Sequence, residues 1–406
     1  MFRKMIGCGV AAAALVFVTG SAMAQDFSAA RISDEIRTIS ADAYQGRYPG
    51  SEGERMVLSW LQAQYEAMGL EPGGPDGQWL QPVELKRYTP VAGSTASWTG
   101  PDGQVRALTP GTDIVLRAVT NDGQASIRGA GLVFAGYGIF APERQWDDYG
   151  DVDVRGKVVI VVAGEPEGER FNGAYATNYE SDAYKADEAF RRGAVGVVTL
   201  AQGDVNSRSW QRTLRGSART RTATPGAADL EFSASALPET VVAWGQAAGV
   251  DIDVADVTDG TFKAVPLQGV SLSIDASETI DTLVTHNLLA RIPGTEHPDE
   301  VIIYSAHWDH VGGAEQHPTV PGDNIWNGAW DNASGTIGVL EMARQLSAAP
   351  RPKRSIVFAH MAAEEMGLMG SYGYAADPVY PLETTVADIN IDMLPLSGST
   401  RDVPIF

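Results

Sequence analysis

A regular alternation of apolar and amphipathic segments after about residue 276 constrains the fold of this chain more than any other feature. Apolar, β-rich runs at 300–307, 354–361 and 386–393 alternate with helical patterns at 334–349 and 366–377. Strands that alternate with helices form parallel sheets with helices on both faces. We therefore expect an α/β fold built on a mostly parallel sheet.

The segments before residue 276 differ in character and predict a division into domains. Residues 51–74 have the periodicity of an amphipathic helix. From about residue 95, short alternating runs broken by Gly, Pro and Asp predict β-hairpins. The polar stretch 208–231 is expected to be a loop. We expect an α/β domain made of residues 25–94 and 276–406, interrupted by a β-rich insert over 95–275.

The first 24 residues have the features of a secretory signal peptide. Arg3 and Lys4 precede a short apolar run, and the small residues Ala22–Met23–Ala24 mark a cleavage site after Ala24. The run is too short for a transmembrane helix, so we expect no membrane association after cleavage. The only cysteine, Cys8, is removed with this segment, which excludes disulfides and thiolate metal ligands. The expected location is periplasmic or secreted.

The net charge of −21 bears on the partners of the chain. A strongly acidic protein is repelled by nucleic acids and by anionic membrane surfaces. Both are therefore excluded as expected partners. The oligomeric state cannot be predicted from these features.

Polar side chains gather where the predicted strands of the C-terminal part end. The set consists of His307 and Asp309, Asp331, Glu364 and Glu365, and Asp392. Because parallel strands end at one edge of a sheet, these side chains are expected to lie close together. Clustered carboxylates repel each other unless a cation binds them. Imidazole with carboxylates suits zinc and, less specifically, manganese or cobalt.

The adjacent glutamates could have two different roles at such a metal site. A hydrolytic site with two metals needs a bridging carboxylate and a free carboxylate that takes a proton from water. One of the pair could bind metal while its neighbour acts as general base.

Four motifs together resemble the secreted di-zinc exopeptidases that include bacterial leucyl aminopeptidases and glutamate carboxypeptidases. They are "SAHWDHVGG", "NGAWDNASG", "AAEEMGLMGS" and "INIDM". "YQGRYPGSEGERM" and "EAMGLEPGG" also resemble the N-terminal part of that catalytic domain, and residues 95–275 resemble the protease-associated domain inserted in many members. The resemblance implies the zinc exopeptidase fold and peptide substrates.

The resemblance also implies roles for individual residues. His307 and Asp392 would bind one Zn²⁺, Asp331 would bridge two, and Glu365 would bind the second. Glu364 would be the general base, and Asp309 would orient the imidazole of His307. Trp308 and Trp330, next to ligands, would line the substrate pocket or pack in the core.

The sequence departs from the family in one respect. The second zinc site needs a histidine downstream of Asp392, and none of the residues after Met393 is a histidine. We therefore expect that the C-terminal part of the peptidase domain is missing, that the second zinc is weakly held or absent, and that this chain has low activity.

Aminopeptidase activity on extracytoplasmic peptides is the leading functional hypothesis. A carboxypeptidase or a glutaminyl cyclase of similar fold is the alternative within enzymes. A non-catalytic binding protein with a vestigial peptidase domain is the alternative of another class, but such relatives lose metal ligands, and those that fall within this chain are intact.

Overall fold

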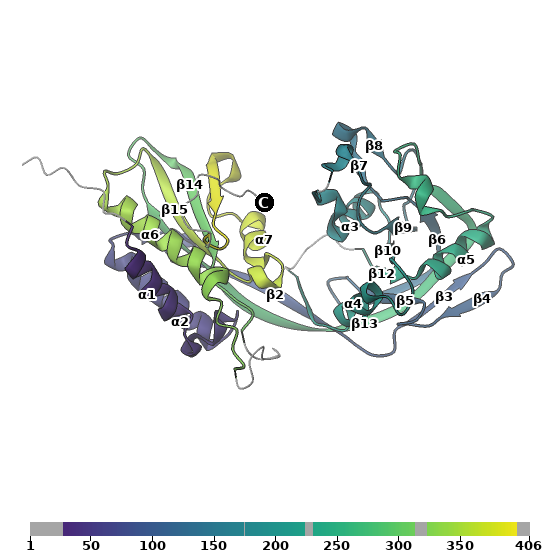
Figure 1. Ribbon diagram of the computed structural model, residues 1–406, viewed down its shortest axis with the longest axis horizontal. Coiled ribbons are helices and arrows are strands. Elements are labelled where there is room, and N and C mark those ends of the chain that lie inside the picture. The colour runs from purple at the N-terminus through teal and green to yellow at the C-terminus, as the bar shows by residue number, and fades with distance from the viewer. Residues whose placement is uncertain (1–26, 174, 224–229, 313–322, 396–406) are drawn as a thin grey trace, which may run out of the picture. The chain divides into compact units, whose positions relative to one another are not determined.

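The computed structural model describes residues 27–173, 175–223, 230–312 and 323–395 (Figure 1). The chain divides into two compact units: the first takes Met1–Gln81, Leu288–His360 and Val379–Phe406, and the second takes Pro82–Asn287 and Met361–Pro378. The predicted signal segment, residues 1–24, lies outside the described residues. Within the described ranges, no helix has the length and apolar character needed to cross a bilayer.

The first unit is a sheet with helices packed against it. The sheet has the order β16-β14-β15-β13, and β16 runs parallel to β14. Helices α1 and α2 pack against α6, as Figure 1 shows. The elements are α1 (Ala29–Ile39), η1 (Asp42–Arg47), α2 (Glu52–Ala67), β1 (Glu71–Pro72), the end of β13 (Val265–Ile292), β14 (His297–His307), α6 (Gly335–Ala348), β15 (Arg354–Met361), η9 (Leu382–Thr384) and β16 (Thr385–Asn390).

Helix α2 shows how local sequence fixes an element of this unit. Ser51 caps it by accepting a hydrogen bond from the backbone N–H of Glu54, and the Glu54 carboxylate accepts one from the Gly50 N–H. Val57, Leu58, Leu61 and Tyr65 are buried on one face, which confirms the predicted amphipathic helix.

A buried histidine lies where α2 meets β15. His360 is fully buried, and its Nε2 lies 2.6 Å from the hydroxyl oxygen of Tyr65. Burial lowers the pKa of His360 to about 3, so the ring is neutral in the folded protein. The ring therefore has a structural role in the core of the first unit.

The second unit contains a mixed sheet of order β13-β6-β9-β10-β12-β5. Strands β6, β9, β10 and β12 run parallel to one another, whereas β13 is antiparallel to β6 and β5 is antiparallel to β12. Its main elements are β2 (Leu80–Pro90), β3 (Thr95–Thr99), β4 (Val105–Leu108), β5 (Ile114–Ala118), β6 (Gln124–Phe134), β9 (Val158–Val162), α3 (Asp182–Arg191), β10 (Gly196–Leu200), α4 (Arg208–Ser217), β11 (Arg221–Ala223), β12 (Phe232–Ala236), α5 (Pro238–Ala248) and α7 (Met369–Ala376).

Two predictions for this unit have different outcomes. The hairpin expected after residue 95 is confirmed, because β3 and β4 pair antiparallel. The loop expected over 208–231 is wrong, because α4 occupies Arg208–Ser217. Ser207 caps α4, and Trp210 is fully buried beside Val115. A single large apolar side chain packs this otherwise polar helix against the unit. The sequence therefore shows no apolar stripe from which the helix could be predicted.

Candidate metal centre

His307 ends strand β14 and is almost completely buried. Its Nδ1 lies 3.1 Å from the backbone carbonyl oxygen of Asp309. Since a carbonyl oxygen can only accept, Nδ1 must carry the proton in this hydrogen bond. In the neutral imidazole, Nε2 then presents an unprotonated lone pair.

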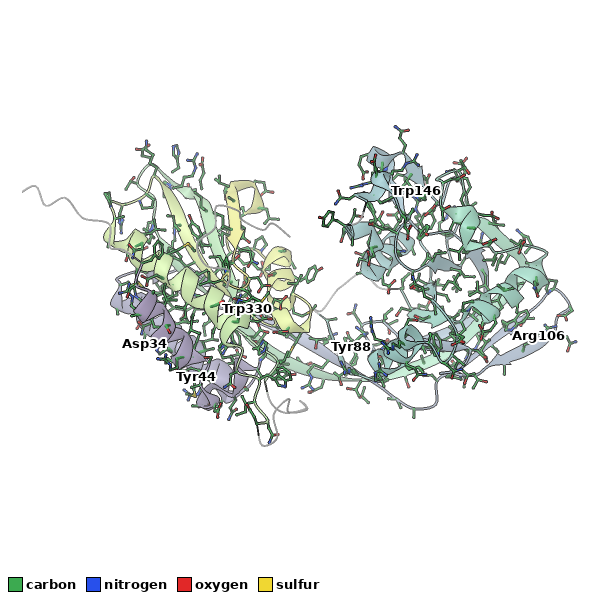
Figure 2. The ribbon with its side chains drawn as sticks, viewed as in Figure 1. Asp34, Tyr44, Tyr88, Arg106, Trp146 and Trp330 are labelled. Carbon is green, nitrogen blue, oxygen red and sulfur yellow. The ribbon has the colours of Figure 1, made fainter. Side chains whose placement is uncertain are left out.

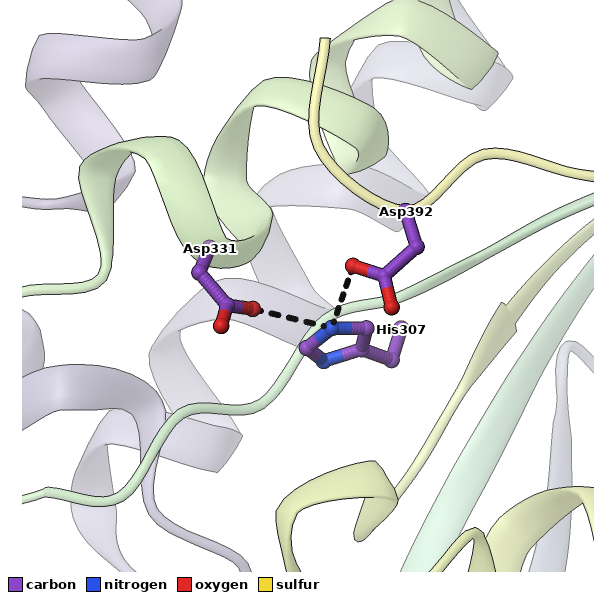
Figure 3. Close-up of side chains that lie close together, drawn as sticks. All are labelled: His307, Asp331 and Asp392. Carbon is purple, nitrogen blue, oxygen red and sulfur yellow. Dashed lines mark hydrogen bonds and ion pairs between the residues drawn. The ribbon is translucent and has the colours of Figure 1, made fainter. Parts of the chain in front are cut away.

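Two carboxylates converge on this same nitrogen. Oδ1 of Asp331 lies 3.2 Å and Oδ1 of Asp392 lies 3.3 Å from His307 Nε2, and Figure 3 marks both contacts with dashed lines. Ligand atoms of the three residues lie within 4.8 Å of one another. A lone pair facing two anionic oxygens is repulsive, and a cation between them reverses the sign of each interaction. One imidazole nitrogen with two carboxylate oxygens is a donor set that suits Zn²⁺.

Asn332 links the two loops that carry these aspartates. The side chain is fully buried. Its Nδ2 donates to the carbonyl of Ile391 at 2.9 Å, and its Oδ1 accepts from the N–H groups of Gly335 at 2.8 Å and Met393 at 3.1 Å. The peptide bond between Asp331 and Asn332 is cis. Asn332 therefore fixes the residue before it, Asp331, relative to the loop of Asp392.

Arg47 is a positioning residue that our sequence reasoning missed. It is fully buried at the end of η1. Nε donates to the carbonyl of Trp308 at 2.8 Å, and Nη2 donates to that of Gly328 at 2.8 Å. Nη1 donates to the carbonyls of Ile39 at 2.9 Å and Asn327 at 2.8 Å. One guanidinium thus ties the loop after His307 to the loop before Asp331.

The preceding residue makes this arrangement possible. Gly46 has φ +63°, and a Cβ built there would lie 2.3 Å from the carbonyl oxygen of Trp326 and 2.8 Å from Cα of Gly312. Only glycine fits both the backbone conformation and the close approach. The glycine of "QGR" is visible in the sequence, but the residues that approach it, Gly312 and Trp326, lie more than 260 residues away.

Asp309 and the two tryptophans also have defined positions. Asp309 is fully buried, with Oδ1 3.6 Å from His307 Nδ1. Trp308 is fully buried, which favours its packing role over a place in the substrate pocket. Trp330, labelled in Figure 2, is 48% exposed, and its indole N–H donates to the carbonyl of Leu394 at 2.8 Å.

Glu364 and Glu365 lie on the short helix η8 (Glu364–Met366), just after β15. Both are half-buried. Their segment, Met361–Pro378, groups with the second unit, whereas His307, Asp331 and Asp392 belong to the first. The roles expected for the two glutamates therefore stay predictions.

Comparison with known proteins finds similarity in the C-terminal part of the chain. The sequence model of peptidase family M28 matches residues 287–405. "Aminopeptidase NAALADL1" of Mus musculus is 33% identical over 149 residues, which cover 35% of this chain and 17% of that protein. A "Probable zinc metalloprotease" of Phaeosphaeria nodorum is 28% identical over 150 residues, covering 35% of this chain and 30% of its own length.

A search of solved structures also gives a match. The "Aminopeptidase from Aneurinibacillus sp. strain AM-1" matches with a TM-score of 0.46 and 19% identity, over 92% of this chain and 72% of that one. The chain spans less than a third of the length of the two relatives named above. Residues 287–405, which hold the converging side chains His307, Asp331 and Asp392, are therefore similar to peptidase family M28.

Proposed function

We propose that this protein is a zinc-dependent aminopeptidase that removes N-terminal residues from peptides outside the cytoplasm. The single observation that carries the proposal is the convergence of Asp331 and Asp392 on the unprotonated nitrogen of His307. The match to family M28 and the aminopeptidase relative support the reaction. The predicted signal segment supports the location.

In the proposed reaction, some residues of this chain would bind zinc and one would orient a metal ligand. His307, Asp331, Asp392 and Glu365 would hold zinc, which supplies a Lewis acid that polarises a carbonyl and acidifies water. Asp309 would keep the imidazole in the tautomer whose Nε2 faces the metal.

Glu364 would carry the proton transfer in this proposal. Its carboxylate would accept a proton from the attacking water and donate it to the leaving amine as the peptide bond breaks. A half-buried glutamate after a strand end has the exposure to solvent that this exchange requires.

The arginines do not favour the carboxypeptidase alternative. A carboxypeptidase needs a cation free to bind the substrate carboxylate. Arg344 is instead engaged by Glu35 at 2.6 Å and by Glu341 at 3.0 Å, and Arg354 forms an ion pair with Glu300.

The Glu364→Gln variant tests the proposal. Zinc content and hydrolysis of leucine p-nitroanilide should be measured on the wild-type chain, this variant and His307→Ala. We expect Glu364→Gln to keep its zinc and lose about 10²–10⁴ of the turnover, the usual contribution of a general base. His307→Ala should lose both. Unchanged turnover in Glu364→Gln would remove the glutamate from the mechanism.

A further inference from the structure

A second histidine, His310, lies beside the metal centre on the loop that follows β14. A ligand atom of its imidazole and a carboxylate oxygen of Asp331 lie within 4.8 Å of each other. Both residues belong to the first unit. The roles expected from the sequence leave His310 out, since they assign a single histidine, His307, to zinc.

Two connections hold the loop after β14 against the loop that leads into Asp331. At one end, the guanidinium of Arg47 donates hydrogen bonds to backbone carbonyls of both loops. At the other end, the backbone N–H of Trp326 donates to the carbonyl of Gly312 at 3.3 Å, in an antiparallel bridge. His310 lies between these two connections, so its position relative to the loop of Asp331 is restricted from both sides.

Gly328 leaves the space that the ring of His310 occupies. It has φ +59°, and a Cβ built there would lie 2.5 Å from Cγ of His310 and 2.7 Å from Nη2 of Arg47. A side chain at this position would displace the imidazole, and the left-handed backbone conformation also favours glycine. The imidazole therefore packs against the backbone of the loop that carries Asp331.

Asp331 can bind a second cation without leaving the first. Figure 3 shows one oxygen of its carboxylate facing Nε2 of His307 and the other oxygen directed away from that nitrogen. The side chain is 40% exposed, so an ion from solvent can reach it. In sites with two metals, the ions lie about 3.5–4 Å apart, a separation that the two oxygens of one carboxylate can bridge.

The separation of the two donors of His310 and Asp331 fits a single ion. Zinc binds imidazole nitrogen and carboxylate oxygen at about 2.0–2.2 Å, so two donors on one tetrahedral ion lie about 3.4 Å apart. The limit of 4.8 Å therefore requires at most about 1.4 Å of side-chain movement. Both side chains are half-buried, so a movement of this size leaves the core in place.

The charges at the centre determine the order in which two ions would bind. Asp309, Asp331 and Asp392 bring three negative charges, and Arg47 brings one positive charge. One Zn²⁺ neutralises this set, so a second Zn²⁺ gains less from electrostatic attraction and should bind more weakly.

We propose that His310 is the imidazole ligand of a second zinc ion, which Asp331 bridges to the ion at His307. Water and the carboxylate expected from Glu365 would complete its coordination. This inference rests on the proposed function and deepens it, because it gives the second zinc a histidine from within this chain. The second zinc should then be weakly held rather than absent.

Zinc titration in competition with a chromophoric chelator tests the inference on wild type, His310→Ala and His286→Ala. His286 is the matched control, since it is also half-buried and lies outside the ligand groups that converge in the described residues. Urea unfolding first establishes that each chain is folded. We expect wild type and His286→Ala to bind two zinc ions, the second more weakly. His310→Ala should bind the first ion like wild type and the second about 100-fold or more weakly.

The outcomes separate this inference from the proposed function. A single zinc ion, bound equally by wild type and His310→Ala, would overturn the inference and leave the metal centre at His307 intact. Two ions bound by His310→Ala with wild-type affinities would also overturn it. Failure of wild type to bind any zinc would overturn the proposed function as well.

Chemical modification of the wild-type chain gives a measurement that needs no variant. Diethylpyrocarbonate modifies imidazole nitrogens that are not bound to metal, and peptide mass spectrometry identifies each modified histidine. The exposed His297 should react at every zinc concentration. His310 should react at one equivalent of zinc and be protected at saturation. Equal modification of His310 under both conditions would contradict its role as a ligand.

Discussion

The link between the two aspartate loops gives the most informative prediction. Asn332→Ala removes three hydrogen bonds, to Ile391, Gly335 and Met393. The bond to Gly335 is fully buried, and the other two are partly buried. A buried group left without a partner costs about 1–3 kcal/mol, and each partly buried bond contributes about 1 kcal/mol. The first unit should therefore lose about 3–5 kcal/mol of unfolding free energy.

The same substitution should weaken the metal site, because Asp331 and Asp392 lose their common support. Loss of such an outer support typically lowers metal affinity by about 10–100-fold. Urea unfolding and zinc titration against a chromophoric chelator measure the two effects. Asn332→Asp keeps the volume but places an oxygen against the Ile391 carbonyl, so it should behave similarly.

Asn206→Ala is the control for this prediction, since Asn206 is exposed in the second unit. It should change stability by less than about 0.5 kcal/mol. If Asn332→Ala unfolds and binds zinc like wild type, the two loops are held by something other than this side chain, and our reasoning about the site is refuted.

Three further predictions follow from buried groups. His360 is neutral when folded, with a pKa of about 3, and protonates near 6.5 when unfolded, so stability should fall by about 1.4 kcal/mol per pH unit as pH drops from about 6.5 to 3. Acid unfolding of the double variant Tyr65→Phe/His360→Leu should lack this part of the slope. Trp210→Ala should destabilise the second unit by about 3–5 kcal/mol in urea unfolding, whereas a loop residue would cost little. Arg47→Lys should lower both thermal stability and zinc affinity, because an ammonium has three donors for the four carbonyls that the guanidinium reaches.

The convergence of His307, Asp331 and Asp392 was predictable because their placement follows from a local rule. His307 ends β14, Asp392 follows β16, and β14 and β16 are parallel neighbours, so their ends meet at one edge. Asp331 was found from its motif, and the structure brings it to the same nitrogen. Strand and helix positions in this part of the chain followed from periodicity alone.

The supporting contacts were not predictable, because they join segments distant in sequence. Arg47 contacts Trp308, 261 residues away, and Asn332 contacts Ile391, 59 residues away. Nothing local marks a polar side chain as the one that holds a remote loop. Helix α4 was missed for a related reason, since its stability comes from burying Trp210 against the sheet rather than from its polar composition.

Zinc affinity of the wild-type chain and of His307→Ala tests the central claim most directly. Competition with a chromophoric chelator should show tight zinc binding to wild type and a loss of about 100-fold or more in the variant. His297→Ala, an exposed histidine at the start of β14, should bind zinc like wild type. If His307→Ala retains the wild-type affinity, the converging His307, Asp331 and Asp392 side chains do not form the metal centre.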